Sequence, residues 1–141
     1  MGLHVMAVFE GKGVFTPVDA ASFFGMDLIK FDDCARWLVS RLHPDGVKCP
    51  GCSAAVTDDN RLSRFRQMGQ IRCPECGKKF TAKTGTILNE TKLEAREIYL
   101  LAVLIYLEVS PPHIAAILRV HVDTVRNWQS KFQALTEVAG V

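Results

Sequence analysis

The chain has 141 residues, of which 48% are hydrophobic, 9% aromatic and 23% charged. This composition is typical of a folded globular protein and excludes a disordered or fibrous one, and the length suits one domain or two small ones. The formal net charge is +2, yet residues 1–60 carry −3, residues 61–96 carry +6 and residues 97–141 carry −1. Positive charge is therefore concentrated in the middle of the chain.

No segment of the sequence predicts a membrane span or a secretory signal. The longest apolar stretch, Ile98 to Leu107, has ten residues, whereas a membrane-spanning helix needs about 20. The first ten residues lack the basic start and the long apolar run of a signal peptide. We therefore expect a cytoplasmic protein without a membrane partner.

The sequence assigns no role to residues 1–30, an N-terminal extension, but Pro17 predicts a short helix after Thr16. The next helix is predicted over residues 32–42, with Asp32 or Asp33 as its cap and the turn His43-Pro44-Asp45-Gly46 at its end. Five apolar residues share one face of this helix, namely Phe31, Ala35, Leu38, Val39 and Leu42.

Four of the five cysteines form two closely spaced pairs, Cys49-Pro50-Gly51-Cys52 and Cys73-Pro74-Glu75-Cys76-Gly77. Two residues between the cysteines let a tight turn aim both sulfurs at one point, and two such turns supply the four tetrahedral ligands that zinc prefers. A disulfide pair or a redox Cys-x-x-Cys motif is the alternative. Since four thiolates leave no open coordination position, we expect one structural Zn²⁺ bound by Cys49, Cys52, Cys73 and Cys76. The fifth cysteine, Cys34, is expected to be a small buried apolar residue.

Between the cysteine pairs and just after them the chain is basic and β-prone. No apolar run here is long enough to form a sizeable hydrophobic core, so we expect the metal to stabilise this segment in place of a core. In the stretch Arg64-Phe65-Arg66-Gln67, strand alternation would place both arginines on one face and Phe65 on the other. A surface that contacts phosphates is one interpretation, and a solvated sheet face is the alternative. The residues expected to contact phosphates are Arg64, Arg66, Arg72, Lys78 and Lys79.

Helical signals return after the second cysteine pair. The sequence Thr91-Lys92-Leu93-Glu94 has the form of a capping box, which predicts a helix from Lys92 to about Glu108. This helix is apolar nearly all round from Ile98, so we expect it to be the central core helix. Ser110-Pro111-Pro112 then ends one helix and begins another.

The last two predicted helices have a helix-turn-helix pattern. The first carries a short apolar stripe made of Ile114, Ala115, Ile117 and Leu118. After the turn Arg119-Val120-His121-Val122, Asp123 is predicted to cap a second helix. Its apolar residues Val125, Trp128, Phe132 and Leu135 repeat at spacings of three, four and three.

The opposite face of this second helix has side chains suited to DNA. Arg and Asn can read guanine and adenine edges, while Lys, Thr and Gln commonly bind phosphates. The alternative is an ordinary helical hairpin with a polar outer face. The DNA contacts expected from this helix are Thr124, Arg126, Asn127, Ser130 and Lys131.

The segments Ile71-Arg72-Cys73-Pro74-Glu75-Cys76-Gly77-Lys78-Lys79-Phe80 and Thr84-Gly85-Thr86-Ile87, followed by a helix at Lys92-Leu93, complete a distinctive order of motifs. From about Phe31 to Leu135 this order resembles the N-terminal region of bacterial insertion-sequence transposases, in which a zinc ribbon precedes a DDE nuclease domain. The resemblance implies that the four paired cysteines bind zinc and that the helix after Val122 contacts bases.

The chain departs from that family in two places. It has Leu118-Arg119-Val120 where the family usually has Leu-Gly-Val, so an arginine takes a position where glycine eases the backbone. The chain also ends six residues after Leu135, which leaves no room for an RNase H-like catalytic domain. We therefore expect no enzymatic activity.

Together these patterns predict an α+β fold: the N-terminal extension (1–30), a helix plus a small four-cysteine zinc ribbon (31–88), and a helix-turn-helix domain (89–141). The expected function is sequence-specific binding of double-stranded DNA by a nucleoid-associated transcriptional regulator derived from a transposase DNA-binding region. The alternatives are a truncated transposase that competes for the same sites, a zinc-ribbon adaptor that docks on RNA polymerase or a transposase, and an RNA-binding protein. Because no zipper is visible, a homodimer or a transcription-machinery partner is expected to supply a second contact.

Overall fold

The computed structural model describes Gly13, residues 16–23 and residues 28–139. The rest of the N-terminal extension and residues 140–141 of the last expected domain lie outside the described residues. The elements in chain order are α2 (Pro17–Phe23), α3 (Phe31–Leu42), α4 (Asp59–Arg66), β1 (Ile71–Arg72), β2 (Lys79–Phe80), α5 (Ala95–Tyr106), α6 (Pro111–Leu118) and α7 (Val122–Ala139).

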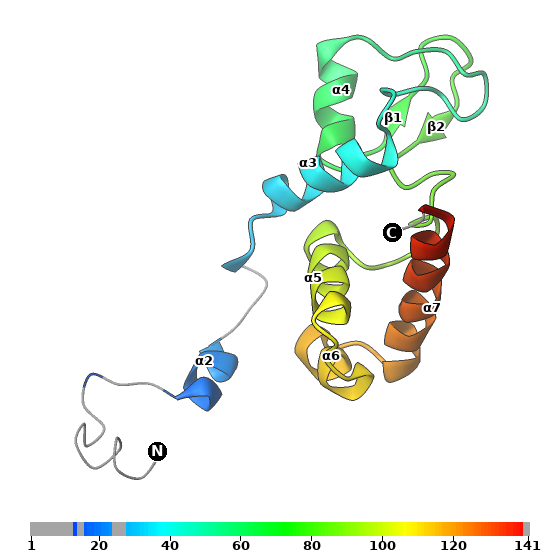
Figure 1. The fold of residues 1–141 in the computed structure, drawn as a ribbon. Helices are drawn as coiled ribbons and strands as arrows, with labels where there is room; N and C mark the ends of the chain where they lie inside the picture. The colour runs from blue at the N-terminus through cyan, green and yellow to red at the C-terminus, as the bar shows by residue number, and fades with distance from the viewer. Residues whose placement is uncertain (1–12, 14–15, 24–27, 140–141) are drawn as a thin grey trace.

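The described part of the chain is α+β, as predicted. Strands β1 and β2 form a two-stranded antiparallel sheet that pairs Ile71 with Phe80 and Arg72 with Lys79. Figure 1 shows this sheet and α4 at one end, helices α5, α6 and α7 at the other, and α3 between them. No helix within the described ranges is long and apolar enough to cross a membrane.

Helix α2 confirms the short helix predicted after Thr16. The Asp19 amide donates to Thr16 Oγ1 at 3.1 Å, and the Thr16 amide donates to the Asp19 carboxylate at 2.9 Å. Pro17 occupies the first helical position, where a backbone amide would have no partner within the helix.

Helix α3 confirms the helix predicted before the first cysteine pair, and it packs on both ends of the molecule. Its cap differs from the prediction, because Lys30 is the N-cap residue and Asp32 and Asp33 lie in the first turn. Of its buried residues, Val39 contacts the ribbon side, whereas Cys34, Ala35 and Leu38 belong to the core formed with α5, α6 and α7. The buried face of α3 therefore packs against both cores.

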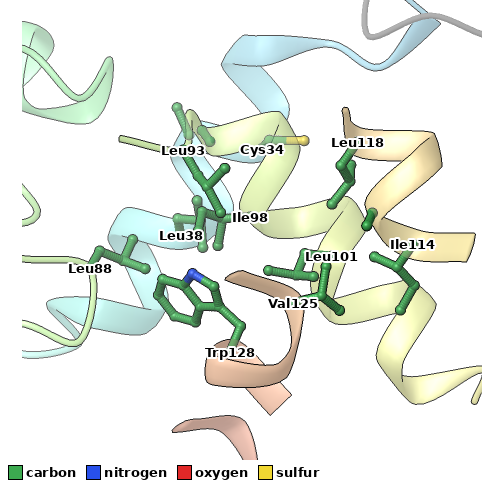
Figure 2. Close-up of a cluster of buried hydrophobic side chains, with 13 residues drawn as sticks. Cys34, Leu38, Leu88, Leu93, Ile98, Leu101, Ile114, Leu118, Val125 and Trp128 are labelled. Carbon is green, nitrogen blue, oxygen red and sulfur yellow. The ribbon is translucent and has the colours of Figure 1, made fainter. Parts of the chain in front are cut away.

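The larger core is built around Trp128 and helix α5. Figure 2 shows the Trp128 indole close to Leu38, Leu88 and Leu101. Helix α5 contacts α3, α6 and α7, which confirms its predicted central position. Its burial is one-sided, however: Ala95, Ile98 and Leu101 are buried, and the other apolar side chains of the helix are partly exposed.

The predicted start of this central helix was wrong. Helix α5 begins at Ala95 instead of Lys92, with Glu94 as its N-cap. The Glu94 amide donates to the Glu97 carboxylate at 2.9 Å, so the capping box lies three residues later. The Thr91 hydroxyl instead accepts from the Leu93 amide at 3.3 Å, and Leu93 is buried.

The strand predicted around Phe65 was also wrong, because this segment is helix α4. Asp58 caps the helix by accepting a hydrogen bond from the Arg61 amide at 3.0 Å. Side chains two positions apart on a helix point about 200° apart, so Arg64 and Arg66 do not share a face.

The ribbon has a small core of its own, contrary to the expectation that metal alone would hold it. Phe65 is almost fully buried and packs edge-on against Phe80 and His43, with ring centroids 6.0 and 5.0 Å away. The other buried residues of this core are Val39, Cys49, Val56, Ile71, Cys73 and Ala82.

Helices α6 and α7 pack on one another and are joined by residues 119–121. Pro111 and Pro112 occupy the first positions of α6, as predicted, and Arg119 at its end has the left-handed conformation, with φ 57°. Asp123 does not cap α7 as predicted: it lies in the first turn, and its amide donates to His121 Nδ1 at 3.1 Å.

Candidate metal centre and nucleic-acid interface

The structure brings together the four cysteines that the sequence singles out. Their sulfurs all lie within 4.8 Å of one another, in an arrangement that could hold a metal ion. The Cys49 and Cys76 sulfurs are 3.6 Å apart, as are those of Cys52 and Cys73. Four sulfurs bound tetrahedrally at about 2.3 Å from one ion would lie about 3.8 Å apart. The donor set therefore fits a tetrahedral metal ion bound by sulfur.

The two cysteine pairs lie in turns with the same backbone geometry. The Ser53 amide donates to the Cys49 carbonyl at 2.9 Å, and the Gly77 amide donates to the Cys73 carbonyl at 3.0 Å. Ser53 and Gly77 both have positive φ, at 65° and 78°. Gly77 adopts this conformation at no steric cost, whereas Ser53 carries a side chain in it.

Backbone amides also hydrogen-bond the sulfurs. The Gly51 amide donates to the Cys49 sulfur at 3.3 Å, and the Glu75 amide donates to the Cys73 sulfur at 3.4 Å. Such bonds favour the charged form of a thiol.

Hydrogen bonds shift the acidity of three of these thiols, Cys49, Cys52 and Cys73. The amides of Cys52 and Gly51 lower the pKa of the Cys49 thiol to about 6, and the Cys76 amide lowers the pKa of Cys73. The Ala54 amide acts in the same direction on Cys52, but hydrogen bonding with the Cys73 sulfur and desolvation outweigh it and raise the pKa of Cys52 to about 12. The two thiols with a lowered pKa, Cys49 and Cys73, are the buried first cysteines of the two pairs.

Neighbouring residues define the limits of the cluster. The Lys78 side chain packs closely against Gly51: a Cβ at position 51 would lie only 2.9 Å from Lys78 Cδ. His43 lies at the end of α3, and its Nε2 is 2.8 Å from the Ala82 carbonyl oxygen. Cys34 is buried in the other core, where burial raises the pKa of its thiol. Neither His43 nor Cys34 belongs to the sulfur cluster.

Helix α7 separates an apolar face from a polar face. Val125 and Trp128 are buried and Phe132 is half-buried, as the spacing predicts, whereas Leu135 is 40% exposed. Among the predicted DNA contacts of α7, Thr124 is half-buried and the other four are exposed, namely Arg126, Asn127, Ser130 and Lys131.

Two of these side chains have partners within the protein. The Arg126 guanidinium lies 3.7 Å from an Asp123 carboxylate oxygen, and both side chains are more than half exposed. Lys131 Nζ lies 4.5 Å from the centre of the Trp128 ring, a cation–π geometry. An exposed ion pair contributes little to stability, so Arg126 can exchange its partner at low cost.

The basic residues predicted to contact phosphates do not form one surface. Arg64 lies beside Arg72 in a pocket between α4 and β1. Arg66 lies near Asp32 and Arg36, on the side of α4 that meets α3. Lys79 is opposite Arg72 in the sheet, and the Lys78 side chain extends past Gly51.

Sequence reasoning left Asn60 and Arg61 out of the predicted site, although both line the pocket with Arg64 and Arg72. The missed signal was helical: an aspartate at position 58 can cap a helix, and Leu62 and Phe65 are spaced by three residues. Reading this segment as a helix would have placed Arg61 and Arg64 on one face.

No protein-family model, curated protein or solved structure matches this chain.

Proposed function

We propose that this protein binds double-stranded DNA in a sequence-specific manner, as a transcriptional regulator derived from the DNA-binding region of an insertion-sequence transposase. The ancestry rests on the resemblance of the motifs from Ile71 to Leu93. The binding proposal rests chiefly on one observation, the exposed polar face of α7 opposite its packed apolar face.

The metal in this proposal is one structural Zn²⁺. Four cysteine sulfurs lie within 4.8 Å of one another, and four thiolates are typical ligands of structural zinc. A zinc ion with four thiolate ligands has no free position for water or substrate, so we expect it to stabilise the ribbon and to catalyse nothing. The ribbon would then hold its basic side chains in place beside α3.

Helices α6 and α7 would act as a helix-turn-helix unit, in which the second helix enters the major groove. Val125 and Trp128 anchor α7 to the core, which leaves Arg126, Asn127 and Ser130 on the outer face. An arginine can donate two hydrogen bonds to guanine, and an asparagine can pair with adenine. Arg126 and Asn127 are therefore the proposed base-reading residues.

The test is a titration of full-length, zinc-loaded protein with its preferred duplex, selected from a random pool, and with random duplex. Arg126→Ala should weaken binding to the preferred duplex by about 1 to 3 kcal/mol and affect random DNA much less. Thr136→Ala, on an exposed position further along α7, is the matched control and should leave both affinities unchanged. An unchanged ratio of specific to random affinity for Arg126→Ala would show that α7 does not read sequence.

A second candidate, an adaptor that docks on a protein partner, is favoured by an apolar pocket of about 650 Å³ between α3, α5 and α7. Trp37 lines this pocket, is 46% exposed, and contacts Tyr99 edge-on with ring centroids 5.5 Å apart. Large exposed aromatic side chains are typical of protein interfaces. If the chain is such an adaptor, Trp37→Ala should abolish binding of the protein partner and leave duplex binding intact. This result separates the adaptor from the DNA-binding proposal.

A further inference from the structure

A polar pocket lies between α4 and β1, and neither the four cysteines nor any residue of α7 lines it. Its volume is about 330 Å³, against about 30 Å³ for one water molecule in the liquid, so it has room for a phosphate group. The side chains that line it are Asp58, Asn60, Arg61, Arg64, Ile71 and Arg72.

The three arginines of this pocket divide into one that is held in place and two that are free to bind. Arg61 Nη1 donates to Asp58 at 3.0 Å, and Arg61 Nε donates to the Arg72 carbonyl at 2.8 Å. Asp58 is the one acid lining the pocket, and the Arg61 amide and guanidinium hold its pKa below the usual range. Its charge is thus already matched, and Arg64 and Arg72 leave the pocket with excess positive charge.

The sheet register adds a second, independent indication. Arg72 pairs directly with Lys79 across β1 and β2, and like charges in opposite positions of a strand pair repel. Within residues 28–139, neither Arg64, Arg72 nor Lys79 forms an ion pair with an acidic side chain. A bound anion would relieve this repulsion and supply the missing negative charge.

We propose that this pocket is a phosphate-binding site in which Arg64 and Arg72 grip one phosphate group and Lys79 adds charge at its rim. Guanidinium groups match phosphate oxygens with paired hydrogen bonds, whereas an ammonium group acts as a point charge. Asn60 can donate a further hydrogen bond from its amide. The site deepens the proposed function and rests on it for the source of the phosphate, a backbone phosphodiester of duplex DNA.

The same geometry provides a matched control on the same helix. Arg66 lies two residues from Arg64 and is also exposed, but it points toward the surface shared with Asp32 and Arg36. Loss of Arg66 removes the same charge from α4 without touching the pocket.

The first experiment measures duplex affinity against salt concentration for the full-length, zinc-loaded protein. Loss of one phosphate contact should lower the slope of log K against log salt by about 0.9. Because Arg64 and Arg72 share one phosphate, Arg64→Gln and Arg72→Gln should each lower the slope by part of this amount, and the double variant should lower it by the full amount. Arg64→Lys should keep the slope but bind more weakly. The pocket leaves out Arg66, which the sequence also predicted to contact phosphates, so Arg66→Gln should match the unmodified protein. Equal slopes for Arg64→Gln and Arg66→Gln would overturn the pocket while leaving DNA binding itself intact. Zinc content and thermal midpoint confirm that each variant is folded.

The second experiment needs no DNA. Inorganic phosphate is added to the ¹⁵N-labelled, zinc-loaded full chain, and the side-chain Nε signals of the arginines are followed by NMR. Saturable shifts at Arg61, Arg64 and Arg72, absent at Arg66, support the site even in a protein that fails to bind duplex, and would then indicate a phosphorylated ligand other than DNA. Small unsaturable shifts of equal size at all four arginines would overturn the proposal.

Discussion

Asp123 places a negative charge beside the proposed reading face of α7. Its carboxylate oxygens lie 3.7 Å from Arg126 and 3.5 Å from His121. Asp123→Asn should strengthen duplex binding by about 0.2 to 1 kcal/mol, because it removes repulsion from DNA phosphates and frees the arginine from an exposed ion pair. The gain should shrink as salt is raised, since salt screens exposed charges.

The control for this prediction is Glu137→Gln, which removes one negative charge at the far end of the same helix. A comparable gain from Glu137→Gln would mean that net charge, and not the position of Asp123, decides the effect.

Arg119 has a backbone conformation that glycine adopts more easily than an arginine. It ends α6 with φ 57°, in the left-handed region that costs a residue with a side chain about 1 to 2 kcal/mol. Arg119→Gly and Arg119→Ala both remove the side chain, but only glycine relieves this strain. We expect the glycine variant to be the more stable by about 1 kcal/mol in urea unfolding, and an alanine variant of equal stability would contradict the strain.

The packing of one side chain, Phe65, holds helix α4 in its position. Phe65 is 1% exposed and lies between Phe80 and His43, which come from different parts of the chain. Phe65→Ala should destabilise the ribbon by about 3 to 5 kcal/mol and, because folding and metal binding are coupled, weaken zinc affinity. Phe65→Leu, which keeps most of the volume, should lose much less. Competition with a zinc chelator measures both effects, and unchanged zinc affinity in Phe65→Ala would show that the aromatic core does not support the metal site.

Some elements are encoded locally and others are not. The proline residues at the start of α2 and α6 place those helix ends correctly, because a missing amide is tolerated only in the first turn. For α4 the alternation Arg-Phe-Arg fits a strand and a helix equally well. The cap at Asp58 and the spacing of Leu62 and Phe65 favour the helix locally, and packing of Phe65 on residues distant in sequence then fixes where the helix lies.

At the scale of the whole molecule, two separate cores predict that the two ends respond differently to metal removal. Both tryptophans lie on the helical side, Trp37 against Tyr99 and Trp128 in the larger core. Chelation should therefore release about one zinc per chain and unfold the ribbon, while Trp128 keeps its native fluorescence. Cys73→Ser should reproduce this state, and Cys34→Ala should retain the zinc.

An outcome in which both indole NMR signals move to unfolded positions on chelation would contradict this division. It would mean that α3, which contributes to both cores, couples them into one cooperative unit.

The sequence by itself determined the four clustered cysteines, the described helices other than α4, and the polar face of α7. These features follow from short-range rules: the reach of a two-residue turn between cysteines, the chemistry of helix starts, and a helical period that sorts apolar from polar positions. Each of these rules involves residues only a few positions apart, so a single sequence carries the information.

The tertiary structure alone decided which basic residues share a surface. Arg64 lies with Arg72 and not with Arg66, because α4 turns successive side chains by about 100° and packs against β1 on one side and α3 on the other. Lys79 meets Arg72 only through the pairing of β1 with β2. The count of charges along the chain located the basic region, but contacts between distant segments divided it into an arginine-lined pocket and a separate face.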